Sequence, residues 1–191
     1  MVSAAVKDRT SDDQRPIMVF VQDEARFGRI TSVGRSWSPI GIRPSVKQQM
    51  IRRYMYAFTA ACHQTGESCS LVLPSANVET MQIFLTEVSE CFPNYFIVMQ
   101  MDQAGWHTSQ KLKLPENIKI ICQPSGSPET NPLENIWDYV KENDFRNRFF
   151  RTMEDVENQL LKSLEKLRHS PEIVKSIISF PHLNIKNLNT N

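Results

Sequence analysis

The stretch "YFIVMQMDQAGWH", residues 95–107, decides the fold. Its first half is a nearly continuous apolar run, which is typical of a strand buried on both faces of a sheet. Asp102 directly follows this run. A second apolar run, "IMVFVQ" from Ile17, is followed in the same way by Asp23. The sequence therefore predicts two buried strands, each with a carboxylate at its end.

The chain has the length and composition of one soluble globular domain. It contains 191 residues, of which 40% are hydrophobic and 23% charged, and this is enough for a single core. No apolar stretch approaches the roughly 20 residues that span a bilayer, so we expect no membrane partner. Residues 1–16 lack the apolar centre of a signal peptide, which predicts a cytoplasmic protein.

The four cysteines contain no CxxC pair. Cys62, His63 and Cys69 form only a weak metal-binding pattern, because thiols in a hairpin give the same spacing. In a cytoplasmic protein this pattern favours free thiols over disulfides or a zinc site.

The net charge of +1 conceals a strong asymmetry along the chain. Residues 25–66 contain no Asp or Glu, and residues 67–110 contain no Lys or Arg. A basic face attracts polyanions and releases their counterions on contact, which makes nucleic acid the leading partner. A solvated surface that only aids solubility is the alternative. The basic residues that we expect to bind DNA are Arg26, Arg29, Arg35, Arg43, Lys47, Arg52 and Arg53.

The remaining patterns predict strands first and then alternating strands and helices, which indicates an α/β fold with a mixed sheet. We expect strands at 17–22, around "GRSWSPIG" (34–41), at 52–62, 69–73, 96–101 and 118–122. We expect helices at 77–91, 109–112, from 132 into the 140s, 153–167 and 171–178. Residues 1–16 are interpreted as an N-terminal extension, 17–150 as the catalytic domain, and 151–191 as its C-terminal helices with a frayed tail.

A third acid, Glu134, stands in the first turn of the predicted late helix. A capping box offers a simpler reason for it, with Asn131 as the N-cap and Pro132 at the first helical position. The presence of Asp23 and Asp102 favours a functional role for Glu134, because residues at strand ends and helix starts are held rigidly enough to form a site.

Three carboxylates of this kind suit a site for Mg²⁺, which prefers oxygen ligands and is often shared with substrate phosphates. Two such ions can activate a water and stabilise the leaving oxygen of an in-line phosphoryl displacement. Asp138 and Glu24 are rival ligands. Glu24 ranks lower because neighbouring residues of a strand point to opposite faces.

Four motifs resemble a known family: "QDEARFGR" (22–29), "GRSWSPIGIRP" (34–44), "MDQAGWH" (101–107) and "QPSGSPETNPLENIWDYVK" (123–141). They resemble the catalytic domain of DDE-type transposases, in the bacterial insertion-sequence branch of the mariner superfamily. The resemblance covers residues 17–141 and implies an RNase H-like (retroviral integrase) fold, a mixed sheet flanked by helices. It also implies that Asp23, Asp102 and Glu134 are the catalytic, metal-binding triad.

The resemblance further implies a metal-dependent DNA endonuclease and strand transferase that moves an insertion sequence by cut-and-paste. Its cofactor would be Mg²⁺, with Mn²⁺ as a substitute and two ions in the site. Its partners would be transposon ends, target DNA and a second copy of the chain in a homodimer. A separate or missing N-terminal helix-turn-helix region and a place at the nucleoid are also implied.

Two residues near the acids keep two interpretations each. His107 either approaches DNA at the scissile phosphate or orients a metal-bound water, or it only caps the short helix that follows it. Trp37, among arginines, either stacks on DNA or packs in a hairpin, whereas Trp106 is expected to pack.

Three other functions remain open. They are another nuclease of the RNase H-like fold, an inactive DNA-binding remnant of a transposase, and a glycosidase with two carboxylates. The acid-free basic segment and the third acid disfavour the glycosidase.

Overall fold

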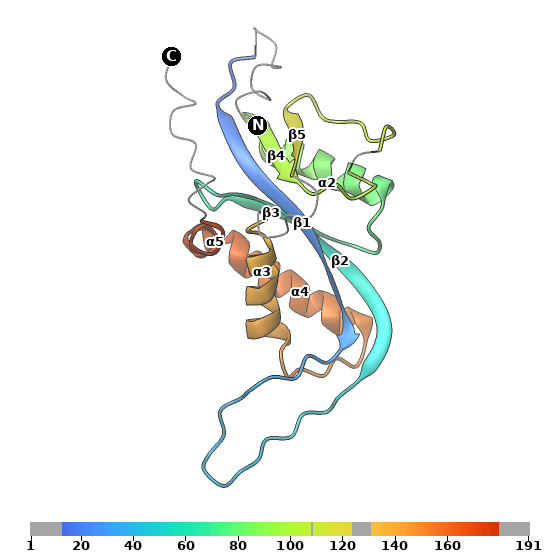
Figure 1. The fold of residues 1–191 in the computed structure, drawn as a ribbon, viewed down its shortest axis with the longest axis vertical. Helices are drawn as coiled ribbons and strands as arrows, with labels where there is room; N and C mark the ends of the chain where they lie inside the picture. Colours follow the sequence, from blue (N-terminus) through green and yellow to red (C-terminus); the bar gives the residue numbers. More distant parts are fainter. Residues whose placement is uncertain (1–12, 108, 124–130, 180–191) are drawn as a thin grey trace.

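A five-stranded mixed sheet forms the centre of the molecule (Figure 1). The computed structural model describes residues 13–107, 109–123 and 131–179. The strands are β1 (Ile17–Ile30), β2 (Met50–Cys62), β3 (Ser68–Leu73), β4 (Phe96–Met101) and β5 (Ile118–Cys122). The helical elements are α2 (Val78–Cys91), α3 (Glu134–Val140), a π-helical turn η2 (Lys141–Phe145), α4 (Met153–Arg168) and α5 (Pro171–Ile178).

The strand order is β3-β2-β1-β4-β5. The first three strands pair antiparallel as a meander, and β4 and β5 extend the sheet in parallel from β1. β4 is buried along its whole length, as its continuous apolar run predicts. The predicted α/β class with a mixed sheet is therefore confirmed.

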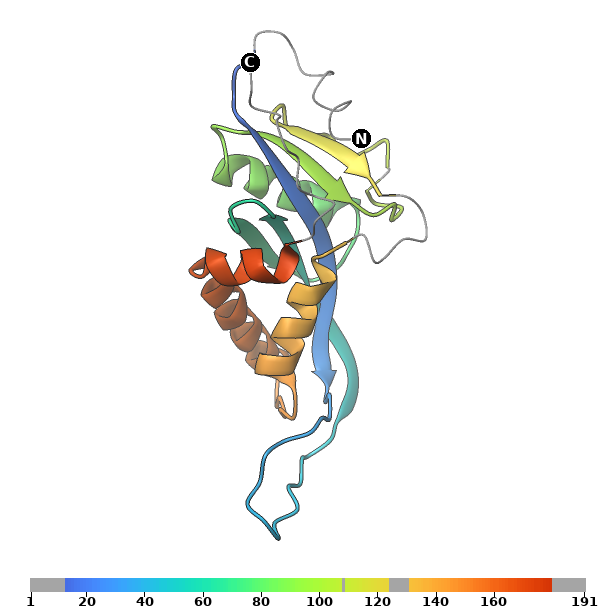
Figure 2. The same ribbon diagram turned by 60° about the vertical axis from the view of Figure 1, so that its left-hand side comes forward.

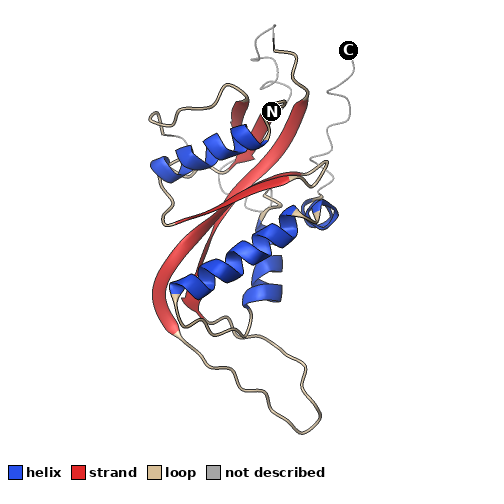
Figure 3. Cartoon of the chain, turned by 180° about the vertical axis from the view of Figure 1, so that it is seen from behind, coloured by secondary structure: helices blue, strands red, loops and turns tan. Residues whose placement is uncertain are grey.

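Helices cover both faces of the sheet (Figures 2 and 3). On one face α2 packs on a core that includes Phe20, Phe58 and Met99. On the other face α3, α4 and α5 pack on a core that includes Val21 and Ala57. Because side chains alternate along a strand, neighbouring residues of β1 and β2 supply opposite cores.

The first strand is longer than predicted. We expected it to end at Gln22, but β1 continues to Ile30 because β2 pairs with it antiparallel over that whole length. Its parallel pairing with β4 ends earlier, at Val21 and Gln100. Asp23 thus lies within β1, at the point where the strand leaves β4 and continues with β2 alone.

The expected strand around "GRSWSPIG" is wrong. Residues 31–49 form a long loop that joins β1 to β2 and projects beyond the end of the sheet (Figure 1). Pro39 and Pro44 have no backbone N–H to donate to a strand partner, and Trp37 and Ile40 are fully exposed. The base of the loop is closed by Asn147, whose side chain donates to the Gly34 carbonyl and accepts from its N–H.

The helix predictions were accurate for the longer segments. Asn77 is the N-cap of α2 and forms a capping box with Thr80, an arrangement that stabilises a helix by about 1 kcal/mol. Residues 109–112 form turns rather than the expected helix, joined by a hydrogen bond from the Leu112 N–H to the Ser109 carbonyl. The expected loop at 124–130 and the tail at 180–191 lie outside the described residues.

In the part of the chain that the structure describes, no helix is long and apolar enough to cross a membrane.

Candidate active site

The sheet brings the first two predicted acids together. The parallel register of β1 and β4 pairs Val21 with Gln100, and Asp23 and Asp102 each lie two residues further on. Asp102 directly follows the last residue of β4, so both acids lie where β1 and β4 part. The two carboxylates are close enough for the charge of Asp102 to raise the pKa of Asp23.

The carboxyl group of Asp23 lies in a largely desolvated position. Burial raises its pKa to about 7, and the charges of Glu24 and Asp102 act in the same direction. The indole Nε1 of Trp137 donates a hydrogen bond of 2.9 Å to Asp23 Oδ2 and partly offsets this rise. Without a cation, Asp23 is therefore close to half protonated at neutral pH.

Two contacts tie the helix that carries Glu134 to β1. Trp137 donates to Asp23 from one turn further along α3, and the Asn131 side-chain amide donates to the Gln22 carbonyl across 3.2 Å. Both contacts reach neighbouring positions of β1, so the start of α3 is fixed beside Asp23. Glu134, the first residue of α3, is exposed at this end.

The capping-box explanation for Glu134 is wrong. The helix begins at Glu134, its N-cap is Leu133, and no side chain caps it. The Asn131 side-chain oxygen accepts instead from the Leu133 N–H at 3.2 Å, as in an Asx-turn. The rival ligand Asp138 is exposed on the same helix.

Glu24 lies on the opposite face of β1 from Asp23, as strand alternation predicts. Its side chain is only 8% exposed. The carboxylate accepts hydrogen bonds from Trp106 Nε1 at 2.5 Å and from the Gln22 side-chain amide at 2.7 Å. These contacts place Glu24 in the interior beside the α2 core rather than at the surface with Asp102.

His107 lies between Glu24 and Asp102. Its Nδ1 is 2.6 Å from Asp102 Oδ1, its Nε2 is 3.1 Å from Glu24 Oε1, and its side chain is 1% exposed. Burial alone would lower the pKa of His107, but the hydrogen bonds and charges of the two carboxylates outweigh it and raise the pKa above its ordinary value. In this position the imidazole bridges two acids and does not face solvent, where a phosphate would lie.

Sequence reasoning missed this bridge. It considered His107 as a DNA contact, as a residue that orients a metal-bound water or as a helix cap, and it considered Trp106 as packing. Trp106 does pack against the α2 core, and it also donates to Glu24. The available signal was a histidine five residues after a strand-end aspartate, close enough in sequence for the chain to turn back on it.

The predicted DNA-binding residues fall into two groups. Arg26, Arg29 and Lys47 contact the protein itself: Arg26 lies over the Tyr54 ring, Arg29 donates to the Phe150 carbonyl at 3.1 Å, and Lys47 lies over the Phe149 ring. Arg26 and Lys47 are nevertheless exposed, and Lys47 lies in the projecting loop. The other residues also lie at or near this loop and are exposed. They are Arg35, Trp37, Arg43, Arg52 and Arg53.

Arg35 and Arg43 line one hollow of about 750 Å³ in the loop. Trp37 stands fully exposed in the same loop, so the hairpin-packing interpretation of Trp37 is wrong. The structure thus separates the loop cations from the acids, and it separates His107 from both the loop and the solvent.

Comparisons with known proteins identify the class of this site. Residues 18–157 match the family model described as "DDE superfamily endonuclease". A curated relative, "Uncharacterized protein y4pE/y4sA" of Sinorhizobium fredii (strain NBRC 101917 / NGR234), is 37% identical over 125 residues, which are 65% of this chain and 93% of the relative.

Solved structures of Mos1 transposase share the fold. The paired-end complex with the left transposon end is 14% identical, with a TM-score of 0.55 over 93% of this chain and 59% of that chain. The mariner paired-end complex with Mn is 12% identical, with a TM-score of 0.58 over 85% of this chain and 56% of that chain. The chain thus spans at most about three-fifths of the length of the Mos1 chains that it matches.

The chain has the RNase H-like fold of a DDE transposase catalytic domain. The chain belongs to the DDE superfamily of endonucleases. The expected resemblance to a DDE-type catalytic domain and the expected RNase H-like fold are thereby confirmed, and the family is one of endonucleases.

Proposed function

We propose that this protein is a divalent-metal-dependent DNA endonuclease and strand transferase that moves an insertion sequence by cut-and-paste. One observation carries the proposal. Asp23 and Asp102 each lie two residues beyond the last register pair of β1 and β4, and Trp137 ties the helix that begins with Glu134 to Asp23. The elements that carry the three acids thus contact one another beside Asp23.

The donor set fits a hard divalent cation. Asp23, Asp102 and Glu134 offer only oxygen ligands, which Mg²⁺ and Mn²⁺ prefer. The raised pKa of Asp23 reflects burial and crowding by other carboxylates, and a bound cation relieves such crowding by favouring the ionised form. Mg²⁺, as one or two ions, would lower the pKa of an attacking water and stabilise the leaving oxygen.

The chain's own residues prepare the acids for this task. Trp137 donates to Asp23 Oδ2, a backbone hydrogen bond from Glu24 also reaches the Asp23 carboxyl, and His107 holds Asp102 Oδ1. The Ala104 N–H also donates to Asp102 Oδ1 at 2.9 Å. Asp23 and Asp102 therefore each have an oxygen held by the protein, which orients the carboxylate as partners around a metal ligand do.

The exposed loop cations supply the DNA contact in this proposal. Arg35, Arg43, Arg52 and Arg53 would neutralise backbone phosphates, and Trp37 would stack on an unpaired base. Mos1 transposase is described with transposon ends as a paired-end complex and as a strand transfer complex. Assembly of this chain as a homodimer on two ends, with a separate helix-turn-helix region, follows the same proposal.

The experiment is metal-dependent nicking of a supercoiled plasmid, combined with joining of a 3′-hydroxyl duplex to that plasmid. Wild-type protein should nick and join DNA in Mg²⁺ or Mn²⁺ and do neither in a chelator. Asp102→Asn and Glu134→Gln should abolish both reactions. Asp138→Asn tests the rival ligand, and Glu154→Gln, an exposed acid on α4, is the matched control that should retain activity.

Nicking without joining would favour another nuclease of the same fold. DNA binding without nicking, unchanged by the acid substitutions, would mean an inactive DNA-binding remnant.

A further inference from the structure

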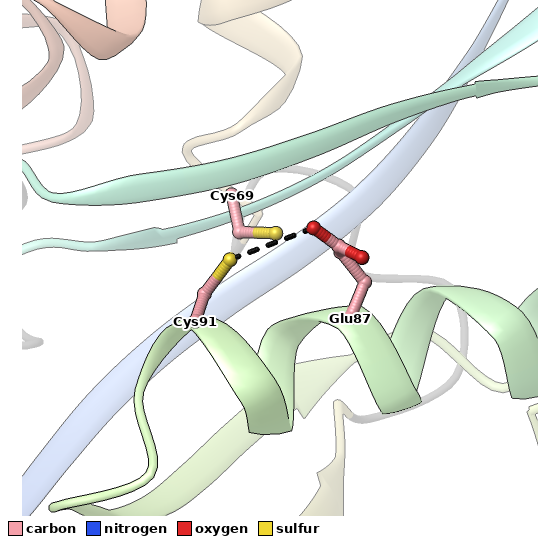
Figure 4. A group of neighbouring side chains, drawn as sticks. All are labelled: Cys69, Glu87 and Cys91. Carbon is pink, nitrogen blue, oxygen red and sulfur yellow. Dashed lines mark hydrogen bonds between the residues drawn. The ribbon is translucent and has the colours of Figure 1, made fainter.

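A second cluster of metal-ligating side chains lies away from the acids. Cys69 on β3 and Glu87 and Cys91 on α2 point toward one another across the gap between strand and helix (Figure 4). One ligand atom from each of the three lies within 4.8 Å of the other two. No step of the proposed DNA chemistry uses these residues.

The cluster is separate from the acids. Cys69 pairs with Ala60 of β2, and Ala60 pairs with Gln22 of β1, so it lies two strands away from the strand of Asp23. It also belongs to the core on the α2 face, whereas Asp23 faces α3. The two sites can therefore be tested independently.

We propose that Cys69, Glu87 and Cys91 bind one thiophilic divalent cation, of which Zn²⁺ is the representative. Two sulfurs and one carboxylate oxygen are ligands that Zn²⁺ accepts and that Mg²⁺ does not favour. Zn–S bonds of about 2.3 Å and Zn–O bonds of about 2.0–2.2 Å put the ligand atoms of a tetrahedral site about 3.5–3.8 Å apart. Cys91 Sγ already lies 3.7 Å from Glu87 Oε1.

The surroundings of the cluster suit a charged metal. The three side chains line a hollow of about 390 Å³ together with Arg168, which leaves room for a water as the fourth ligand. Two thiolates and one carboxylate carry three negative charges, which a divalent cation and the Arg168 guanidinium balance. Arg168 is close enough to act on the charge of both thiols.

The metal-free cluster is held together by weaker contacts. Burial raises the pKa of both thiols, so both sulfurs carry protons, and Cys91 donates to Glu87. A bound cation would replace these protons. It would also join β3, at the edge of the sheet, to the end of α2.

The test is a titration of the fully reduced protein with Zn²⁺ by calorimetry and with Co²⁺ by absorption. Wild-type protein should bind one equivalent of each, and Co²⁺ should give a sulfur-to-cobalt charge-transfer band. Cys91→Ser, at an exposed position, should abolish the band without loss of folding, and Cys69→Ser should do the same. Glu87→Gln should weaken binding by about tenfold or more.

Two variants serve as controls. Cys122→Ser removes an exposed thiol elsewhere and should leave Co²⁺ binding unchanged, and Asp102→Asn should also retain it. The proposal is overturned if reduced wild-type protein shows no charge-transfer band, or if the band survives Cys91→Ser. Formation of a Cys69–Cys91 disulfide on oxidation, with no metal bound by the reduced chain, would also overturn it. None of these results bears on DNA cleavage.

Discussion

The indole of Trp137 donates a hydrogen bond of 2.9 Å to the carboxylate of Asp23, 114 positions away in the sequence. This bond joins the helix that begins with Glu134 to the strand that carries the first acid. The same indole packs edge-on against Phe27 further along β1. One side chain thus sets the distance between strand and helix and orients a proposed metal ligand.

Trp137→Phe removes the donor and keeps much of the packing. We expect the free energy of unfolding to fall by about 1–3 kcal/mol, because a buried charged acceptor loses its partner. Mn²⁺ affinity should fall about tenfold or more, since Asp23 loses its orientation. Chemical denaturation and calorimetry check the two effects. Equal Mn²⁺ affinity in the variant would show that the bond is only structural.

The pKa of Asp23 predicts how stability depends on pH in the metal-free protein. The pKa is about 7 in the folded chain and about 3.9 in an unfolded chain. Between these values the folded state keeps a proton that the unfolded state has lost, so the free energy of unfolding falls as pH rises. The total fall is about 4 kcal/mol.

Asp23→Asn should remove this contribution and should be more stable than the wild type at pH 8 in a chelator. Denaturant unfolding at several pH values measures it. If the free energy of unfolding depends on pH in the same way in both proteins, the raised pKa does not belong to Asp23.

The bridge formed by His107 predicts graded effects on metal binding. His107→Ala should lower Mn²⁺ affinity by about tenfold to a hundredfold, because Asp102 loses the partner that holds it. His107→Asn should recover part of the affinity, since the Asn amide can replace the Nδ1 donor. Glu24→Gln should have a smaller effect, because it acts on Asp102 through His107. If calorimetry finds that His107→Asn binds Mn²⁺ no more tightly than His107→Ala, a positioning role for His107 is contradicted.

The exposed loop predicts a salt-dependent contact with DNA. Each phosphate contact contributes roughly 0.9 to the slope of log affinity against log salt concentration. Arg35→Ala combined with Arg43→Ala should therefore reduce the slope by about 2. Lys162→Ala, an exposed cation on α4, is the control and should leave the slope unchanged. An unaltered slope in the double variant would place the DNA elsewhere.

The sequence predicted the buried strands and the long helices because their patterns are local. The apolar run before Asp102 defines a strand, and the helical spacing of apolar residues after Asn77 defines a helix. Neither pattern depends on the rest of the chain. The extension of β1 beyond Asp23 was not predictable in this way, since it depends on pairing with β2. Part of the loop 31–49 resembled a strand because it contains aromatic and apolar residues. In the folded chain Trp37 and Ile40 are exposed instead of buried.

The surroundings of the three acids were harder to predict than the acids themselves. In the sequence, Asp23 and Asp102 stand out because each follows an apolar run, and Glu134 stands out because it lies at the start of a helical pattern. Their partners do not stand out. In the sequence Trp137 is one of several apolar residues on its helix, and Glu24 is expected to point to the opposite face of the strand from Asp23. Only the folded chain shows that His107 spans the gap between the carboxylates of Glu24 and Asp102.

The central claim is that Asp23, Asp102 and Glu134 together hold a divalent metal. The most direct test is a calorimetric titration with Mn²⁺, in the presence of a short DNA duplex, of the wild type and of Asp23→Asn, Asp102→Asn and Glu134→Gln. We expect the wild type to bind Mn²⁺ and each variant to lose this binding while it keeps its fold. Mn²⁺ binding that persists unchanged in all three variants would contradict it.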